Sequence, residues 1–275
     1  MRSRRESVIS HLILVIGTII ALYPALSILI LALSKRGARP SALGVPRSFT
    51  LDNFARAWSG GGFDSALLSS ATVAFSVVVV TVTLSVLTGY ALAWLRVPMG
   101  ATILGVLLIG LVLPYEGVIV PLHSLIKDMG LINTTAALIL PQIGLSVSLG
   151  VFWMHTYFRG IPKSLPEAAS IDGASRFQTL TKVLLPAALP GVSALALIVF
   201  LYAWNDFLLA LVLVPDNVDV RTAPLSLSFF AGNVKGADIG VTAAAAVIVA
   251  LPLVIVYFFL QRNFINGLLG GAVKE

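Results

Sequence analysis

One polar stretch, residues 162–186, reads PKSLPEAASIDGASRFQTLTKVLLP and lies between two long apolar runs. Its residue types predict a helix, a break and a second helix. Ser164 and Glu167 have the spacing of a capping box at the start of the first helix. Gly173 can adopt the left-handed backbone conformation that ends a helix. Ser175 can then cap the helix that follows.

The second of these helices should carry an apolar stripe. Phe177, Leu180 and Leu184 recur at positions i, i+3 and i+7, which places them on one helical face. The first helix carries the small residues Ala168 and Ala169. Burying a large apolar side chain stabilises a structure by roughly 1.5–3 kcal/mol, so this stripe needs a surface to pack on. That surface is either the chain's own membrane helices or a partner protein.

Apolar runs surround this stretch on both sides. About 20 apolar residues cross the hydrocarbon core of a bilayer as a helix. The first run exceeds the roughly 7–15 apolar residues of a cleavable signal peptide, so we expect an uncleaved membrane helix. Pro114 and Glu116 interrupt the third run, and Asn133-Thr134 can cap the fourth. The sequence thus predicts one membrane domain, residues 1–275, whose loop 159–187 joins the fourth and fifth of six helices: 11–33, 66–95, 101–120, 134–158, 188–214 and 239–260.

The composition excludes other classes of protein. Of 275 residues, 58% are hydrophobic and 11% are charged, whereas soluble domains have about 25% charged residues. A soluble enzyme, a disordered chain and a disulfide scaffold are therefore excluded; the chain has no cysteine. The net charge is +6, but the basic residues lie in short segments between apolar runs. We therefore expect contact with membrane lipid and no nucleic-acid partner.

The basic residues also predict an orientation. If both termini are cytoplasmic, ten of the 18 Lys and Arg residues lie inside and eight lie outside. The basic head, with Arg2, Arg4 and Arg5, favours the same arrangement. We therefore expect a multi-pass protein whose two termini are both cytoplasmic.

The spacing within the polar stretch resembles a known family. Glu167-Ala168-Ala169, Gly173 and Leu185-Pro186 stand at the intervals of the EAA loop of ABC importer permeases, with Val183 where that family often has Ile. Residues 171–174 and 203–206 resemble forms found in the carbohydrate-uptake branch. The tail 261–274 is similar to the second, maltose-permease-like subunit of that branch.

The resemblance implies an all-α permease with the type I ABC importer architecture, in a bacterial or archaeal cytoplasmic membrane. It implies alternating access for a sugar or related polyol, with ATP hydrolysed by another chain. The implied partners are a second homologous permease, a cytoplasmic ATP-binding subunit dimer and an extracytoplasmic solute-binding protein. The EAA loop would be the coupling helix that docks on the ATPase, through Glu167, Ala168, Ala169, Asp172, Gly173, Ala174, Phe177 and Leu180.

No enzyme or cofactor site is expected in this chain. No Gly-x-x-x-x-Gly-Lys-Ser/Thr phosphate loop occurs in it, so ATP and Mg²⁺ would be bound by the partner ATPase. His11, His123 and His155 fall on different elements, and no pair has the spacing of a metal site.

Polar residues within the apolar runs are candidates for the solute path. A charge at the middle of a membrane helix costs about 2.5–3.5 kcal/mol, so such residues usually face a cavity or a partner. Trp204, Asn205 and Asp206 could line the solute path or contact the partner permease or a neighbouring helix. Glu116 could face the cavity or lie in the outer interface.

Two functions outside the ABC importers remain as alternatives. An ion-coupled secondary transporter would use Asp206 or Glu116 as an ion or proton relay. It would leave the polar helix pair at 162–186 without a role. A membrane enzyme would need His residues or carboxylates gathered near one membrane face, and the sequence shows no such pattern.

Overall fold

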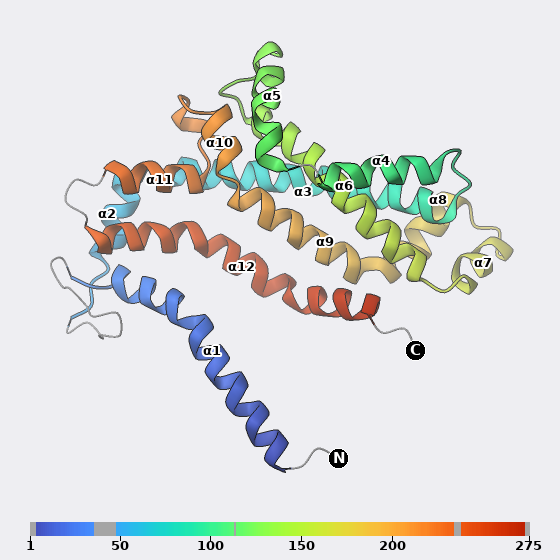
Figure 1. Cartoon of the computed structure of the whole chain (residues 1–275), viewed down its shortest axis with the longest axis horizontal. Helices are drawn as coiled ribbons and strands as arrows, with labels where there is room; N and C mark the ends of the chain where they lie inside the picture. The colour runs from blue at the N-terminus through green and yellow to red at the C-terminus, as the bar shows by residue number, and fades with distance from the viewer. Residues whose placement is uncertain (1–3, 36–47, 113, 234–237, 273–275) are drawn as a thin grey trace. The chain divides into compact units, whose positions relative to one another are not determined.

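The chain folds into helices (Figure 1), and the computed structural model describes residues 4–35, 48–112, 114–233 and 238–272. Within these ranges the only β-type pairing is one isolated bridge, between Ser34 and Phe49. The all-α prediction is therefore confirmed. The helices are α1 (Arg4–Ala32), α2 (Asp52–Gly61), α3 (Phe63–Trp94), α4 (Gly100–Val112), α5 (Tyr115–Asp128), α6 (Thr135–Gly160), α7 (Ser164–Ile171), α8 (Arg176–Gln178), the π-helix η1 (Thr179–Leu184), α9 (Leu185–Asn205), α10 (Leu208–Leu213), the 3-10 helix η2 (Val218–Val220), α11 (Ala223–Asn233) and α12 (Ile239–Ala272).

Five of the described helices are long and apolar enough to cross a membrane on their own. A sixth span is possible if α4 and α5 are taken together, although the two helices meet at an angle of 101°. Membrane helices are read from length and apolar composition, because about 20 apolar residues match the hydrocarbon thickness. The five are Val8–Ala32, Phe63–Trp94, Thr135–Gly160, Arg176–Asn205 and Ile239–Gln261.

The third expected span, residues 101–120, is not one straight helix. It breaks at Pro114, whose backbone is extended (φ −66°, ψ 124°) and which precedes the first residue of α5. Proline lacks the N–H that a continuing helix would use, and its ring clashes with the preceding turn. The sequence indicated an interruption at this point, and in the structure α4 and α5 meet there at a sharp angle.

The fifth expected span, residues 188–214, has different ends in the structure. Its helix begins much earlier, because α8, η1 and α9 follow one another without a break from Arg176 to Asn205. The π-helical turn lies just before Pro186, where the Leu185 N–H donates to the carbonyl of Leu180. At the other end the helix stops at Asn205, and α10 is a separate short helix.

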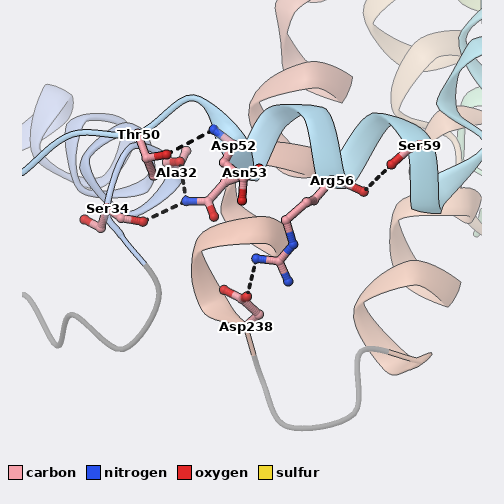
Figure 2. A network of polar contacts seen from close by, with 8 residues as sticks. All are labelled: Ala32, Ser34, Thr50, Asp52, Asn53, Arg56, Ser59 and Asp238. Carbon is pink, nitrogen blue, oxygen red and sulfur yellow. Dashed lines mark hydrogen bonds and ion pairs between the residues drawn. The ribbon is translucent and has the colours of Figure 1, made fainter.

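Two compact units make up the chain, and the first comprises Met1–Asp64 and Ser226–Pro252. Figure 2 shows the polar contacts that fix α2 in this unit. The Asn53 amide, 1% exposed, donates to the carbonyls of Ala32 and Ser34, both at 2.8 Å. Arg56 forms an ion pair with Asp238, with 2.8 Å between Nη1 and Oδ2. The end of α1 and the start of α12 are thereby both tied to α2.

The second unit comprises Ser65–Leu225 and Leu253–Glu275. Within it, α6 packs against both α4 and α9. Helices α5 and α10 lie at one end of α6 and α9, and α7 lies at the other (Figure 1). A Cβ atom on Gly89 of α3 would lie 2.8 Å from the backbone nitrogen of His155 in α6. The close approach of α3 and α6 therefore requires glycine at this position.

We predict that Gly89→Ala destabilises the protein. The added methyl group would meet the backbone of α6, which cannot move aside as a flexible side chain can, and overpacking of this kind costs about 1–3 kcal/mol. Thermal unfolding of the detergent-purified protein should show a lower midpoint. The matched control is Gly144→Ala in α6, where an added Cβ has no neighbour within 4 Å. Equal midpoints for the two variants would contradict the close packing of α3 and α6.

Candidate functional site

The polar stretch forms the expected helix, turn and helix. Helix α7 ends at Ile171, and Gly173 adopts a left-handed conformation with φ +76°. Ser175 forms a capping box with Gln178: the Gln178 N–H donates to Ser175 Oγ at 3.3 Å, and the Ser175 N–H donates to Gln178 Oε1 at 2.8 Å. The turn and the second cap are therefore as predicted.

The predicted cap of the first helix is wrong. Lys163 precedes α7 in helical conformation, and no side-chain hydrogen bond caps this end. A cap residue needs an extended backbone so that its side chain can reach back to the first turn. Ser164 is already the first residue of α7 and Glu167 lies on its exposed surface, so their spacing does not produce a capping box.

The helix pair has a buried face and an exposed face. Ala169 and Leu180 are buried, together with Leu184. Phe177 was expected on the same stripe, but 68% of its surface is exposed. The π-helical turn that starts at Thr179 changes the helical register, so the i, i+3, i+7 rule no longer keeps Phe177 on the side of Leu180 and Leu184.

The exposed face of the loop combines small residues with large apolar ones. Glu167, Ala168, Asp172 and Gly173 are exposed, and Ala174 is half-buried. Leu165, Ile171 and Phe177 are exposed by 42%, 87% and 68%. We call Leu165, Ile171 and Phe177, with Ala168 between them in sequence, the outer face of the loop. Contiguous exposed apolar patches mark interaction sites, and these exposed side chains are candidates for such a patch.

A tyrosine that the sequence analysis did not single out holds this loop in place. The Tyr90 hydroxyl of α3 donates to the carbonyl of Arg176 at 2.9 Å. Its ring also packs edge-on against Phe158, with 6.1 Å between ring centroids. Tyr90 lies near the end of an apolar run, which is a common place for tyrosine in membrane proteins, so its residue type alone did not distinguish it.

A cavity of about 1030 Å³ lies where α9 ends, and residues of α4, α5, α6, α9 and α10 line it. Three of the four residues proposed from the sequence for the solute path line it, namely Glu116, Asn205 and Asp206. Trp204 does not: it is 3% exposed and stacks on Phe200 at 5.5 Å. Sequence reasoning missed the other polar residues of the wall, which are Tyr115, Gln142, Ser146 and Tyr202.

Asp206 was expected inside a continuous helix, but it lies at the break between α9 and α10. Its backbone is extended (φ −63°, ψ 121°). Its Oδ1 accepts a hydrogen bond from the Leu209 N–H at 3.1 Å, and its Oδ2 accepts one from the Tyr115 hydroxyl at 2.7 Å. Tyr115 is the first residue of α5, after the break at Pro114. One hydrogen bond therefore joins the two helix breaks at the cavity wall.

Asn205 and Glu116 present polar groups at the same wall. The Asn205 amide donates to the carbonyl of Leu201 at 2.8 Å, so one of its N–H bonds is already used within α9. Glu116 is exposed, next to Tyr115 in the first turn of α5. No group of three or more His, Cys, Asp or Glu residues in the described ranges could hold a metal ion.

Comparisons with known proteins give one consistent result. The model of the family described as "binding-protein-dependent transport system inner membrane component" matches residues 3–269. The chain is 34% identical to a trehalose transport system permease protein of Mycobacterium tuberculosis, over 92% of this chain and 93% of that protein. It is 33% identical to a trehalose/maltose transport system permease protein of Thermococcus litoralis, over 98% and 99%.

A solved structure shares the fold. One chain of a bacterial ABC transporter involved in import of the acidic polysaccharide alginate superposes with a TM-score of 0.77. The superposition covers 96% of this chain and 99% of that one, at 22% sequence identity. The type I importer fold expected from the sequence is therefore confirmed.

We predict that Tyr115→Phe destabilises the cavity wall. Removing the hydroxyl takes a donor from the half-buried Asp206 Oδ2, and a hydrogen bond to a carboxylate contributes about 1.5–3 kcal/mol. The thermal midpoint of the purified protein should fall, whereas Tyr202→Phe, in a tyrosine that is 63% exposed, should leave it nearly unchanged. The double variant Tyr115→Phe/Asp206→Asn should lose less stability than the sum of the single variants. Additive losses would mean that the two side chains do not stabilise each other.

Proposed function

Because the chain belongs to the family of binding-protein-dependent transport system inner membrane components, we propose that it forms the membrane path for a sugar or related polyol in an ATP-driven importer. It is a transport subunit rather than an enzyme, and it is a multi-pass protein of the cytoplasmic membrane. Since the sequence contains no phosphate loop, ATP and Mg²⁺ would be bound by the partner ATPase.

The single observation that carries the proposal is the outer face of the loop. A docking helix must expose apolar side chains and still keep a fixed shape. Ala169 and Leu180 are buried and anchor the pair, while Ile171 and Phe177 project outward. The small residues Ala168 and Gly173 would let a partner approach the backbone closely. Glu167, Asp172 and Ala174 complete the surface that would meet the cytoplasmic ATP-binding subunit dimer.

The same loop continues directly into the helix that reaches the cavity. Arg176 and Asn205 are the ends of one helical segment of 30 residues, which corresponds to about 45 Å at 1.5 Å per residue. Its first turn follows the docking loop directly, and its last residue lines the cavity wall. A displacement of the loop by the ATPase would therefore move the wall of the solute path. This continuity supports alternating access driven from outside the chain.

The proposed solute path runs through the cavity of the second unit. Glu116, Asn205 and Asp206 would contribute polar groups to it, and Trp204 would support the wall from behind. The sugar class comes from the relatives, whose names assign them trehalose or maltose. With both termini on the cytoplasmic side, α7 would face the ATPase dimer. A second homologous permease and an extracytoplasmic solute-binding protein would complete the importer.

Purification of the tagged chain from its native membranes tests this proposal. Gentle solubilisation and mass spectrometry should recover an ATP-binding subunit and a second permease with it. Uptake should also persist when ionophores collapse the ion gradients while cellular ATP is maintained. A chain that purifies alone, with uptake abolished by ionophores, would support an ion-coupled secondary transporter that uses Asp206 or Glu116.

We predict that Ala168→Arg prevents binding of the ATP-binding subunit dimer to the permease. A long charged side chain on the outer face would prevent close approach of the ATPase, so uptake should fall at least about tenfold, the equivalent of about 1.4 kcal/mol. The amount of ATPase recovered with the tagged chain should fall in parallel. The matched control is Ala55→Arg, at an exposed alanine of α2, which should leave the ATPase bound. Full uptake by Ala168→Arg would place the ATPase elsewhere.

A further inference from the structure

Gln142 of α6 carries a polar group without a partner in the described part of the chain. Only 5% of this residue is exposed, so its side chain is more than nine-tenths buried. Neither Nε2 nor Oε1 has a hydrogen-bond partner among the described residues. Buried amide groups are almost always paired, because an unpaired one loses the hydrogen bonds that water would have given it. The amide of Gln142 therefore needs a partner from outside this part of the chain.

The position of Gln142 indicates where that partner would come from. Gln142 lines the cavity together with Leu145, Ser146 and Leu149. These four residues recur at the 3- and 4-residue spacing of one helical face, so a single face of α6 forms this part of the wall. The cavity size of about 1030 Å³ is at the upper end of the range for small-molecule sites.

We propose that the side-chain amide of Gln142 recognises the transported solute, a neutral molecule with hydroxyl groups on adjacent carbon atoms. The inference rests on the transport function proposed above and assigns it a specificity-determining residue. An amide offers a hydrogen-bond donor and an acceptor side by side, and two neighbouring hydroxyl groups offer the complementary pair. The rotatable bonds of the glutamine side chain let the amide turn from the wall toward the cavity.

The charges around the cavity favour a neutral solute. The acidic side chains that line the cavity are Glu116 and Asp206, and no Lys, Arg or His of the described chain lines it. A sugar acid or a sugar phosphate would meet acidic side chains and no cationic one, which disfavours its binding. A neutral sugar would meet the amide of Gln142 and the exposed ring of Tyr202, which can pack against its C–H groups.

Uptake of labelled sugars by cells that carry the intact importer tests the inference. The probes are neutral sugars, including trehalose and maltose, together with a uronate-bearing disaccharide. Gln142→Leu should lower the initial uptake rate of the transported neutral sugar at least about tenfold, because two hydrogen bonds to the solute are lost. Gln142→Asn, which keeps the amide on a shorter side chain, should retain intermediate activity. Recovery of the ATPase with the tagged chain should stay unchanged.

The matched control is Gln261→Leu in α12. The amide of Gln261 donates to the carbonyl of Phe258 at 3.2 Å, and the residue does not line the cavity. Its replacement should leave both the uptake rate and the preference among sugars unchanged. An equal loss of uptake in Gln142→Leu and Gln261→Leu would overturn the inference, since it would reflect a general effect of losing a glutamine from a membrane helix.

The outcomes separate this inference from the function on which it rests. If the wild-type importer takes up none of the neutral sugars, the proposed function fails and the role of Gln142 fails with it. If the wild type transports a sugar and Gln142→Leu transports it equally well, only the inference is wrong. If Gln142→Leu loses the second permease on purification, the amide pairs with that subunit instead, and the inference is again wrong.

A labelling experiment gives a second test that does not depend on transport rates. Because the chain contains no cysteine, Gln142→Cys introduces a single thiol into this subunit. In the complete importer, the transported sugar should protect this thiol from a small thiol-reactive reagent. Met129→Cys, at a residue that is 54% exposed and lies outside the cavity wall, should react equally with and without the sugar. Absence of protection at position 142 would overturn the inference.

Discussion

A membrane helix can stop within the bilayer only where its freed backbone groups find partners, and two helices of this chain stop near one cavity. Pro114, which precedes α5, has no N–H group that would need a partner. Asp206 ends the second, and its carboxylate accepts hydrogen bonds from the Leu209 N–H and the Tyr115 hydroxyl. The hydrogen bond from Tyr115 thus joins the break after α9 to the first residue of α5, which follows the break at Pro114. The two interruptions are thus linked at the cavity wall.

A single helical segment, Arg176–Asn205, runs between the two ends of the second unit. The helix from Arg176 to Asn205 starts within the polar loop 159–187 and ends at the cavity wall. Its start is fixed by the capping box of Ser175 and by the hydrogen bond from Tyr90 to the Arg176 carbonyl. A displacement of the loop would therefore be carried along this helix to the cavity wall. The π-helical turn at Thr179–Leu184 lies within this helix, close to its start.

The sequence predicted the features that depend on local chemistry. Apolar runs indicated the membrane helices, and Gly173 indicated the turn of the loop. Thr134 and Ser175 were expected to cap two helices, and each side chain accepts the expected backbone hydrogen bond. Features set by distant partners were missed. At the break, Asp206 accepts a hydrogen bond from Tyr115, 91 positions away. The exposure of Phe177 depends on a π-helical turn that no residue spacing reveals. Gln142 could not be singled out from the sequence, because its burial and its lack of a hydrogen-bond partner among the described residues are visible only in the folded structure.

The hydrogen bonds of Asp206 also bear on whether transport is driven by an ion gradient or by a partner ATPase. An ion or proton relay needs a carboxylate that can bind and release its cargo while its surroundings stay intact. Here both carboxylate oxygens of Asp206 hold structural groups, one the start of α10 and the other the start of α5. Using Asp206 as a relay would break the contacts that form the cavity wall. If the amide of Gln142 binds the solute and the helix from Arg176 to Asn205 carries the displacement of the loop, Asp206 can keep its structural contacts. Solute binding and conformational change would then belong to different residues of the same helix bundle.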